Sequence, residues 1–193
     1  MQKELKQTSS RLKERPISRE KIEECAIELF RAKGAEKTSI SEIAHAAGMA
    51  KGTFYLYFKD KDALVDSVIS RYAREFMEQV VVPNSDVTRL VTLSAAVIAY
   101  FKLNRMFLIE LRKNLLSENL LPSTRATVAA FSQLVVNNLN QYKSYPIKNW
   151  EVYTRVILGM VLDVCYKAII EDELGDEAQI MMSDFLKRFF SCE

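Results

Sequence analysis

The chain has 193 residues, and its 27 Lys and Arg nearly balance its 25 Asp and Glu, for a formal net charge of +2. Hydrophobic residues make up 49% and charged residues 27%, a composition that excludes a disordered chain. The near-neutral total by itself argues against a nucleic-acid-binding protein, which usually has a basic excess.

The N-terminal part of the chain is predicted to form an arm followed by short helices. Residues 1–16 are polar and basic. Ser18 is the expected N-cap of a first helix, and Gly34 ends it because glycine readily adopts a left-handed conformation. Ser39 and Glu42 have the spacing of a capping box, which predicts the start of a second helix.

The pattern continues with two further helices. The second helix ends at Gly48, and a third is predicted over 51–58. A fourth begins after Asp60 and ends at Pro83. It carries an apolar residue at every fourth position: Leu64, Val68, Tyr72, Phe76 and Val80.

The rest of the chain also has helical periodicity. Five more helices are expected: from Ser85 or Asp86 to Leu103, from Met106 to about Leu116, from Pro122 to Leu139, from Trp150 to Ile170 and from Ala178 to Phe190, with a break at Tyr145-Pro146. Nine helices and no convincing strand predict an all-α fold. We expect two domains, residues 1–61 and residues 62–193.

The second and third helices have the pattern of a helix-turn-helix motif. Small residues at Ala44 and Ala47 let the two helices cross closely, and Gly48 makes the turn. Phe54 and Phe58 are expected to face inward. The opposite face would then enter the DNA major groove with these residues: Lys51, Gly52, Thr53, Tyr55 and Tyr57.

The stretch from Thr38 to Leu64, TSISEIAHAAGMAKGTFYLYFKDKDAL, resembles the signature of TetR/AcrR-type transcriptional regulators, and the resemblance extends back to Ile22. By position, it implies phosphate contacts from Thr38, Ser39, Tyr57 and Lys61, base contacts from Tyr55, and phosphate or base contacts from Lys51, Gly52 and Thr53. Leu56 stands where the family often has an aromatic residue, and Ala50 where it often has Ser or Pro. The basic arm, with Arg11, Lys13 and Arg15, is either disordered or follows a groove.

The resemblance also implies a homodimer that binds an inverted repeat in double-stranded DNA and is released by a small-molecule effector, most often as a repressor. The two C-terminal helices support a dimer because their apolar faces are too wide for exposure to water. The expected interface residues are Gly159, Met182, Phe185 and Phe189. The alternative is that both helices are buried within one chain.

The helix from Trp150 to Ile170 has a single polar line. Its residues recur at every fourth position: Glu151, Arg155, Gly159, Asp163 and Lys167. Two acid-base pairs four residues apart, Glu151 with Arg155 and Asp163 with Lys167, are expected to stabilise the helix.

An apolar cavity between the C-terminal helices would accept an apolar or aromatic ligand. Candidate lining residues are Tyr100, Phe101, Phe107, Phe131, Tyr153 and Met160, with Asn104, Arg155 and Asp163 as its polar groups. At helical spacing, such apolar residues more often belong to a packed core.

Other classes of protein are excluded by single residue types. Three distant cysteines and the lone His45 argue against a disulfide framework, a zinc site or a Ser-His-Asp enzyme, so no enzyme activity, metal or cofactor is expected. The longest apolar run, 95–101, is far short of the ~20 residues of a membrane helix, and a secretion signal is not recognised. We therefore expect a soluble, cytoplasmic protein without membrane contact.

The charge total divides unevenly between the two expected domains. Residues 1–61 carry 13 Lys and Arg against 9 Asp and Glu, so the remainder of the chain is mildly acidic. A basic DNA-binding domain followed by an acidic ligand-binding domain accounts for the near-neutral sum, and DNA binding should weaken with salt. The alternative function is a DNA-organising or scaffold protein on the same fold, whose C-terminal domain would be packed solid.

Overall fold

The computed structural model describes residues 16–81, 90–115, 117, 120–139, 149–175 and 177–190. In these ranges the regular elements are nine α-helices and two π-helical turns, which confirms the all-α prediction. The chain divides into two compact units, Met1–Val68 and Ile69–Glu193, so the division falls somewhat after the expected boundary at residue 61. The basic arm residues, the predicted helix start at Ser85 or Asp86 and the break at Tyr145-Pro146 lie outside the described residues.

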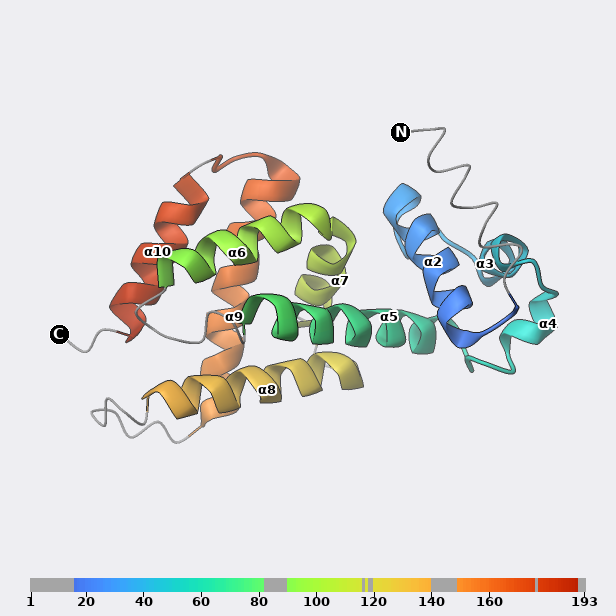
Figure 1. Cartoon of the computed structure of the whole chain (residues 1–193), viewed down its shortest axis with the longest axis horizontal. Coiled ribbons are helices and arrows are strands. Elements are labelled where there is room, and N and C mark those ends of the chain that lie inside the picture. Colours follow the sequence, from blue (N-terminus) through green and yellow to red (C-terminus); the bar gives the residue numbers. More distant parts are fainter. Residues whose placement is uncertain are drawn as a thin grey trace. The chain divides into compact units, whose positions relative to one another are not determined.

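The first unit contains α2 (Arg19–Lys33), α3 (Ile40–Ala47), α4 (Lys51–Phe54) and the beginning of α5 (Lys61–Phe76), shown in blue to cyan in Figure 1. The predicted caps are confirmed. The Ser18 side chain accepts a hydrogen bond from the amide of Lys21, and Gly34 has φ of +84°. The capping box of α3 is complete, and Gly48 after it is left-handed with φ of +72°.

α4 is shorter than predicted. It ends at Phe54, and the chain continues to Phe58 in turns. Most of their amides bond to the carbonyl three residues before, as from Leu56 to Thr53 at 3.2 Å, whereas the amide of Phe58 bonds to Phe54, four residues before, at 3.1 Å. Phe54 and Phe58 are both buried, with ring centroids 5.7 Å apart. The side of the motif that faces the core therefore matches the prediction, although the helix is a single turn.

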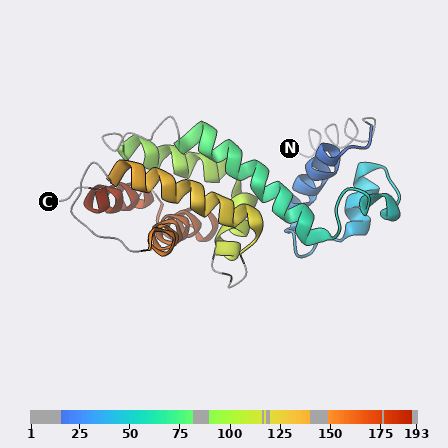
Figure 2. The same ribbon diagram turned by 90° about the horizontal axis from the view of Figure 1, so that it is seen from below.

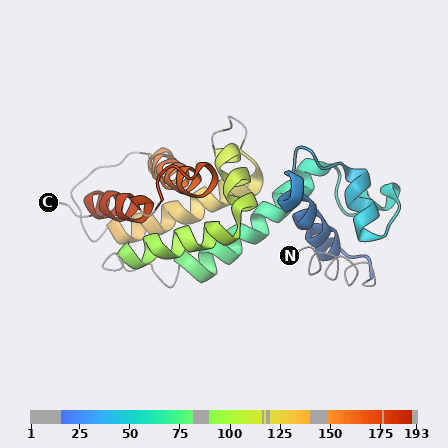
Figure 3. The same cartoon turned by 90° about the horizontal axis from the view of Figure 1, so that it is seen from above.

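The second unit consists of the end of α5 with the π-helical turn η1 (Met77–Val81), then α6 (Leu90–Leu103), α7 (Arg105–Leu115), α8 (Pro122–Leu139), α9 (Trp150–Tyr166) with η4 (Lys167–Glu171), and α10 (Glu177–Phe190). Figures 2 and 3 show α6 and α8 running alongside the end of α5, while α9 crosses them steeply. α9 packs on α7, α8 and α10, and α10 packs on α6.

The apolar stripe of the fourth predicted helix is confirmed. Leu64, Val68, Tyr72, Phe76 and Val80 are all buried. The helix changes from α to π after Phe76, a change that inserts one residue per turn. Of the described helices, none alone is long and apolar enough to span a membrane; α6 and α7 together have the length and composition, but the chain bends by 105° between them.

Candidate nucleic-acid interface and ligand pocket

The outward face of the helix-turn-helix motif carries most of the predicted DNA-binding residues. Lys51 and Gly52 are exposed, Tyr55 is 49% exposed and Thr53 is half-buried. Tyr55 is held from one side, because its ring meets that of Phe54 edge-on at 5.5 Å. The same surface thus carries the ammonium group of Lys51, the exposed backbone of Gly52 and the phenol of Tyr55. This combination suits contact with phosphates and base edges.

The side chains of the two residues before α3 make hydrogen bonds within their own unit. Thr38 is 1% exposed, and its hydroxyl donates to the carbonyl of Gly34 at 2.8 Å, so this side chain does not face outward as a phosphate contact would. Ser39 is exposed, but its hydroxyl donates to Glu42 Oε2 at 2.8 Å. Lys33 also donates to Glu42. Lys33 and the capping box lower the pKa of Glu42 to about 2.

Lys61 is also turned toward its own chain. Its ammonium group donates to the carbonyls of Ala35 at 3.0 Å, Glu36 at 3.3 Å and Thr38 at 3.3 Å. An ammonium has three N–H donors, and here all three bind the turn between α2 and α3. Lys61 therefore positions that turn, whereas the resemblance implied that it binds a phosphate.

We call residues 51–58 the recognition segment. Tyr57 joins this segment to the start of α2. Its hydroxyl donates to the carbonyl of Ile17 at 3.3 Å, and its own carbonyl accepts a hydrogen bond from Arg19 at 3.2 Å. The Arg19 guanidinium also lies 4.3 Å from the centroid of the Phe58 ring. A tyrosine hydroxyl has one proton to donate, and in Tyr57 that proton is already used. The phosphate contact of Tyr57 stays a prediction.

Three exposed residues of the first unit were not among the predicted DNA contacts. Lys37 precedes α3, Leu56 follows Tyr55, and Lys59 lies eight residues after Lys51. The side chain of Lys59 is 82% exposed, and its contact to Asp60 is a loose 3.7 Å ion pair. The four-residue spacing of Lys51, Tyr55 and Lys59 was the signal in the sequence for the last of these.

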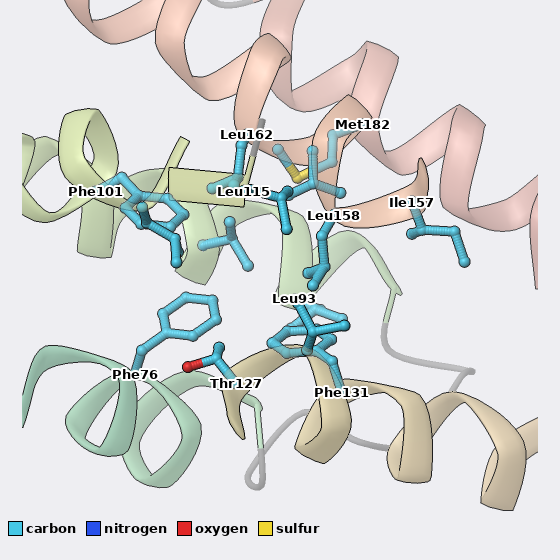
Figure 4. A pocket seen from close by; sticks show the side chains of 14 residues that line it. Phe76, Leu93, Phe101, Leu115, Thr127, Phe131, Ile157, Leu158, Leu162 and Met182 are labelled. Atoms are coloured by element: carbon cyan, nitrogen blue, oxygen red, sulfur yellow. The ribbon is translucent and has the colours of Figure 1, made fainter. Parts of the chain in front are cut away.

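The second unit contains a cavity of about 90 Å³. Its walls come from α5 to α10, and every lining side chain is apolar except Thr127, whose hydroxyl donates to the carbonyl of Ser123 at 2.8 Å. Figure 4 shows Phe76 and Phe131 facing the cavity from one side and Leu158, Leu162 and Met182 from the other. The volume exceeds that of several waters but is below the roughly 300–1,000 Å³ of most ligand pockets.

Phe76 is the centre of the aromatic groups beside this cavity. Its ring stacks on Phe101 at 5.3 Å and on Phe131 at 6.1 Å, and it meets Tyr100 edge-on at 5.2 Å. The Tyr100 hydroxyl donates to the carbonyl of Tyr72 at 3.0 Å, and burial raises its pKa. The last residue of α5 is therefore part of the cavity wall.

Only two of the nine predicted ligand-binding residues, Phe101 and Phe131, line the cavity. Phe107 and Tyr100 lie in the core behind the wall. Asn104 donates to the carbonyl of Tyr100. The others are on α9 and point elsewhere: Tyr153, Arg155, Met160 and Asp163. Ile157, Leu158, Val161 and Leu162 line the cavity instead, because α9 is apolar on several sides and the spacing alone did not identify the inner one.

Comparison with models of protein families finds a match to the part of the chain that contains the helix-turn-helix motif. The model for bacterial regulatory proteins of the tetR family matches residues 22–68, which span α2 to the first half of α5. These residues are about a quarter of the chain, and over them it is similar to bacterial regulators of the tetR family. An uncharacterised HTH-type transcriptional regulator of Bacillus subtilis, YvdT, is 44% identical over 61 residues, which are 32% of this chain and 31% of that relative. The sequence match thus covers about a third of the relative.

Solved structures extend the likeness to the whole fold. The fatty acid degradation regulator FadR of Bacillus halodurans has a TM-score of 0.66 at 16% identity, over 93% of this chain and 97% of that one. FadR of Bacillus subtilis, in a structure with stearoyl-CoA, has a TM-score of 0.64 at 16% identity, over 89% and 96%. At such identities the likeness shows the fold alone, and it includes the second unit.

The polar line of α9 faces its own unit. Arg112 on α7 binds Asp163 with 2.6 Å between Nη2 and Oδ1, and Arg155 donates to the carbonyl of Leu115 at 3.1 Å. Lys167 pairs with Glu171 and Glu173. These contacts replace the predicted pair of Asp163 with Lys167; the side chain of Glu151 lies outside the described residues.

Next to this polar line, α9 has an apolar and exposed stripe. Val152, Val156 and Met160 lie one turn apart along it, and Val156 is 57% exposed. Gly159 lies beside them, and a Cβ atom built on it would meet no atom within 4 Å. On α10, Ile180 and Met181 are exposed as well. We call Val152, Val156, Gly159 and Met160 the α9 face.

The predicted interface residues on α10 differ in how far they are buried. Met182 is buried and lines the cavity, so it is not available to a second chain. Phe185 is half-buried, and the side chain of Phe189 lies outside the described residues. Gly159 is the predicted interface residue that the α9 face includes.

Metal and thiol chemistry find little support in the described residues. Within them, His, Cys, Asp and Glu side chains form no group of three or more that could hold a metal ion. Cys25 and Cys165 are buried, and burial raises the pKa of the Cys165 thiol to about 12. Cys165 is therefore a packing residue and a poor nucleophile.

Proposed function

We propose that this chain is a transcriptional regulator of the TetR family that binds double-stranded DNA through the outward face of its helix-turn-helix motif. The observation that carries the proposal is the exposure of Lys51, Gly52 and Tyr55 together on that face, over a buried Phe54. Lys37 and Lys59 are further exposed cations of the same unit, and cations provide most of the sequence-independent affinity for DNA.

The α9 face supports a homodimer as the DNA-binding form. An apolar stripe one helical turn apart, with a glycine that leaves room for close approach, suits a helix of a second copy better than water. Two copies related by a two-fold axis would present their motifs to successive major grooves about 34–36 Å apart. The expected operator is therefore an inverted repeat, and blocking a promoter there would make the protein a repressor.

The cavity in the second unit supports control by a small molecule with an apolar part. Its walls offer almost no polar partner, and the similar FadR structure was solved with stearoyl-CoA, a ligand with a long apolar chain. A ligand larger than the cavity would have to displace wall residues such as Phe76. Because Phe76 ends the helix that begins at Lys61, that displacement would move α5 and change the DNA-binding form.

The alternative, a DNA-organising protein without an effector, requires a solid second unit. The cavity of about 90 Å³ counts against it, since voids of this size are few in well-packed proteins.

The test begins with selection of duplexes from a random DNA library by the wild-type chain. Lys51→Ala combined with Tyr55→Ala should weaken binding to the selected DNA by at least about 30-fold, because a phosphate contact and a base contact are both lost. Lys102→Ala combined with Leu103→Ala, on the exposed side of α6, is the matched control and should bind normally. Equal binding by both double variants would refute the proposal.

The effector is tested with stearoyl-CoA as the probe. We expect it to release the selected DNA from the wild-type chain and to raise the unfolding temperature. Val161→Phe fills the cavity and should abolish both effects, whereas Leu103→Phe on the surface should keep them. Release that is the same in both variants would place the effector outside the cavity.

A further inference from the structure

The recognition segment has an apolar group at a place where solvent exposure is unfavourable. Leu56 is 82% exposed, the highest value for a large hydrophobic residue in the described part of the chain. The neighbouring Phe54 and Phe58 are buried, so the turn that places them inward also places Leu56 outward. The backbone holds it there, since its amide donates to the carbonyl of Thr53 at 3.2 Å.

Gly52, one turn before Leu56, has no internal reason to be a glycine. Its backbone is not left-handed, and a Cβ atom built on it would meet no atom within 4 Å. Glycine is a poor residue inside a helix, so alanine would suit the folded chain at least as well. The space beside Gly52 is therefore open within the first unit.

Exposed lysines flank Gly52 and Leu56 along the chain. Lys51 precedes Gly52, and Lys59 follows Leu56 by three residues; both side chains are exposed. Two lysines around a small apolar group suit the major groove, where phosphates line the edges and the thymine C5-methyl is the apolar group on a base edge.

We propose that Leu56 reads a thymine in the major groove by contact with its C5-methyl group, and that Gly52 leaves the space through which the base edge reaches it. Leu56 is then a specificity-determining residue, while Lys51 and Lys59 bind phosphates on either side. This inference rests on the proposed DNA binding and deepens it.

The experiment uses the operator selected by the wild-type chain. Each thymine is replaced in turn by uracil, which removes only the methyl group. At one thymine of each half-site, the replacement should weaken wild-type binding by about 3- to 10-fold, the usual effect of losing one buried methyl contact. Leu56→Ala should bind the thymine and uracil duplexes equally, whereas Leu103→Ala, a leucine that is 80% exposed on α6, should discriminate as the wild type does.

Gly52→Ala separately tests the role of the open space beside Gly52. Its unfolding temperature should stay the same or rise, because the folded chain has room for the methyl group. Its affinity for the selected operator should fall by about 10-fold or more, since the new side chain stands where the base edge would lie.

The outcomes separate the inference from the proposed function. If the wild-type chain enriches no sequence, both fail. If it selects an operator and Leu56→Ala keeps the wild-type response to uracil, or if no thymine position responds at all, the methyl contact of Leu56 is refuted while DNA binding stands. Normal operator binding by Gly52→Ala refutes the role of this open space.

Discussion

The ammonium group of Lys61 donates a hydrogen bond to the backbone carbonyl of Ala35, with 3.0 Å between nitrogen and oxygen. The contact joins the first residue of α5 to the turn that precedes α3. Two more carbonyls of the same turn accept from the same group. The turn carries the N-cap Ser39, so Lys61 acts on the helix-turn-helix motif through the backbone.

Replacing Lys61 by methionine should lower the free energy of unfolding by about 1–3 kcal/mol, because three carbonyls lose a charged donor. Lys61→Arg should recover only part of the loss, since a planar guanidinium does not reproduce three converging N–H bonds. Urea titration measures the change. Unchanged stability together with lost DNA affinity would instead assign Lys61 to a phosphate.

Lys59→Met should have the opposite profile. The side chain is exposed and its ion pair is loose, so stability should change by no more than about 0.5 kcal/mol. DNA affinity should fall, and the slope of log affinity against log salt should decrease by about one, the signature of one lost phosphate contact. Lys102→Met provides the control in fluorescence anisotropy titrations, and an identical salt slope in both variants would remove Lys59 from the interface.

The capping box of α3 should make stability depend on pH. Lys33 and Ser39 hold the pKa of Glu42 at about 2 in the folded chain, below its ordinary 4.5. A lowered folded pKa means that the ionised form stabilises the fold above pH 4.5, and that this contribution disappears as the pH falls from 4.5 toward 2. The stability difference between wild type and Glu42→Gln, measured by denaturant titration at each pH, should shrink over that window. A constant difference would show that the charge of Glu42 contributes nothing.

Local signals made much of the fold predictable from the sequence. Ser18, Ser39 and Gly48 define helix ends through contacts within a few residues, and those contacts form as expected. The stripe from Leu64 to Val80 likewise follows from helical spacing alone. These features depend on backbone hydrogen bonds and periodicity, both of which are read along the chain.

The direction of single polar side chains was less predictable. Arg155 and Asp163 lie on a line along α9, but spacing does not say what that line faces. The direction of these side chains depends on Arg112 and on the carbonyl of Leu115 at the end of α7, which tertiary packing brings close. For the same reason Thr38 and Lys61, both polar and suited to phosphate, proved to bind backbone carbonyls of their own unit.

The α9 face yields a prediction about assembly. Val156→Lys should weaken dimerisation by at least about 30-fold, because a charge would be buried at the centre of an apolar contact. The fold of one chain should persist, since Val156 is already exposed. Sedimentation velocity over a concentration series measures the shift from dimer to monomer.

Gly159→Leu gives an independent check of the same face. Within one chain the new side chain has open space, so the unfolding temperature of the monomer should hold while dimerisation is lost. Leu103→Lys is the surface control for both variants. Dimers that survive Val156→Lys and Gly159→Leu would move the interface away from α9.

The account as a whole depends on two chains reading one operator through the exposed face of Lys51 and Tyr55. Native mass spectrometry of the wild-type chain with its selected duplex measures this directly. We predict two chains per duplex, and loss of the complex in the Lys51→Ala and Tyr55→Ala double variant at the same concentration. A complex of one chain per duplex with full affinity, or a double variant that binds as the wild type does, would contradict it.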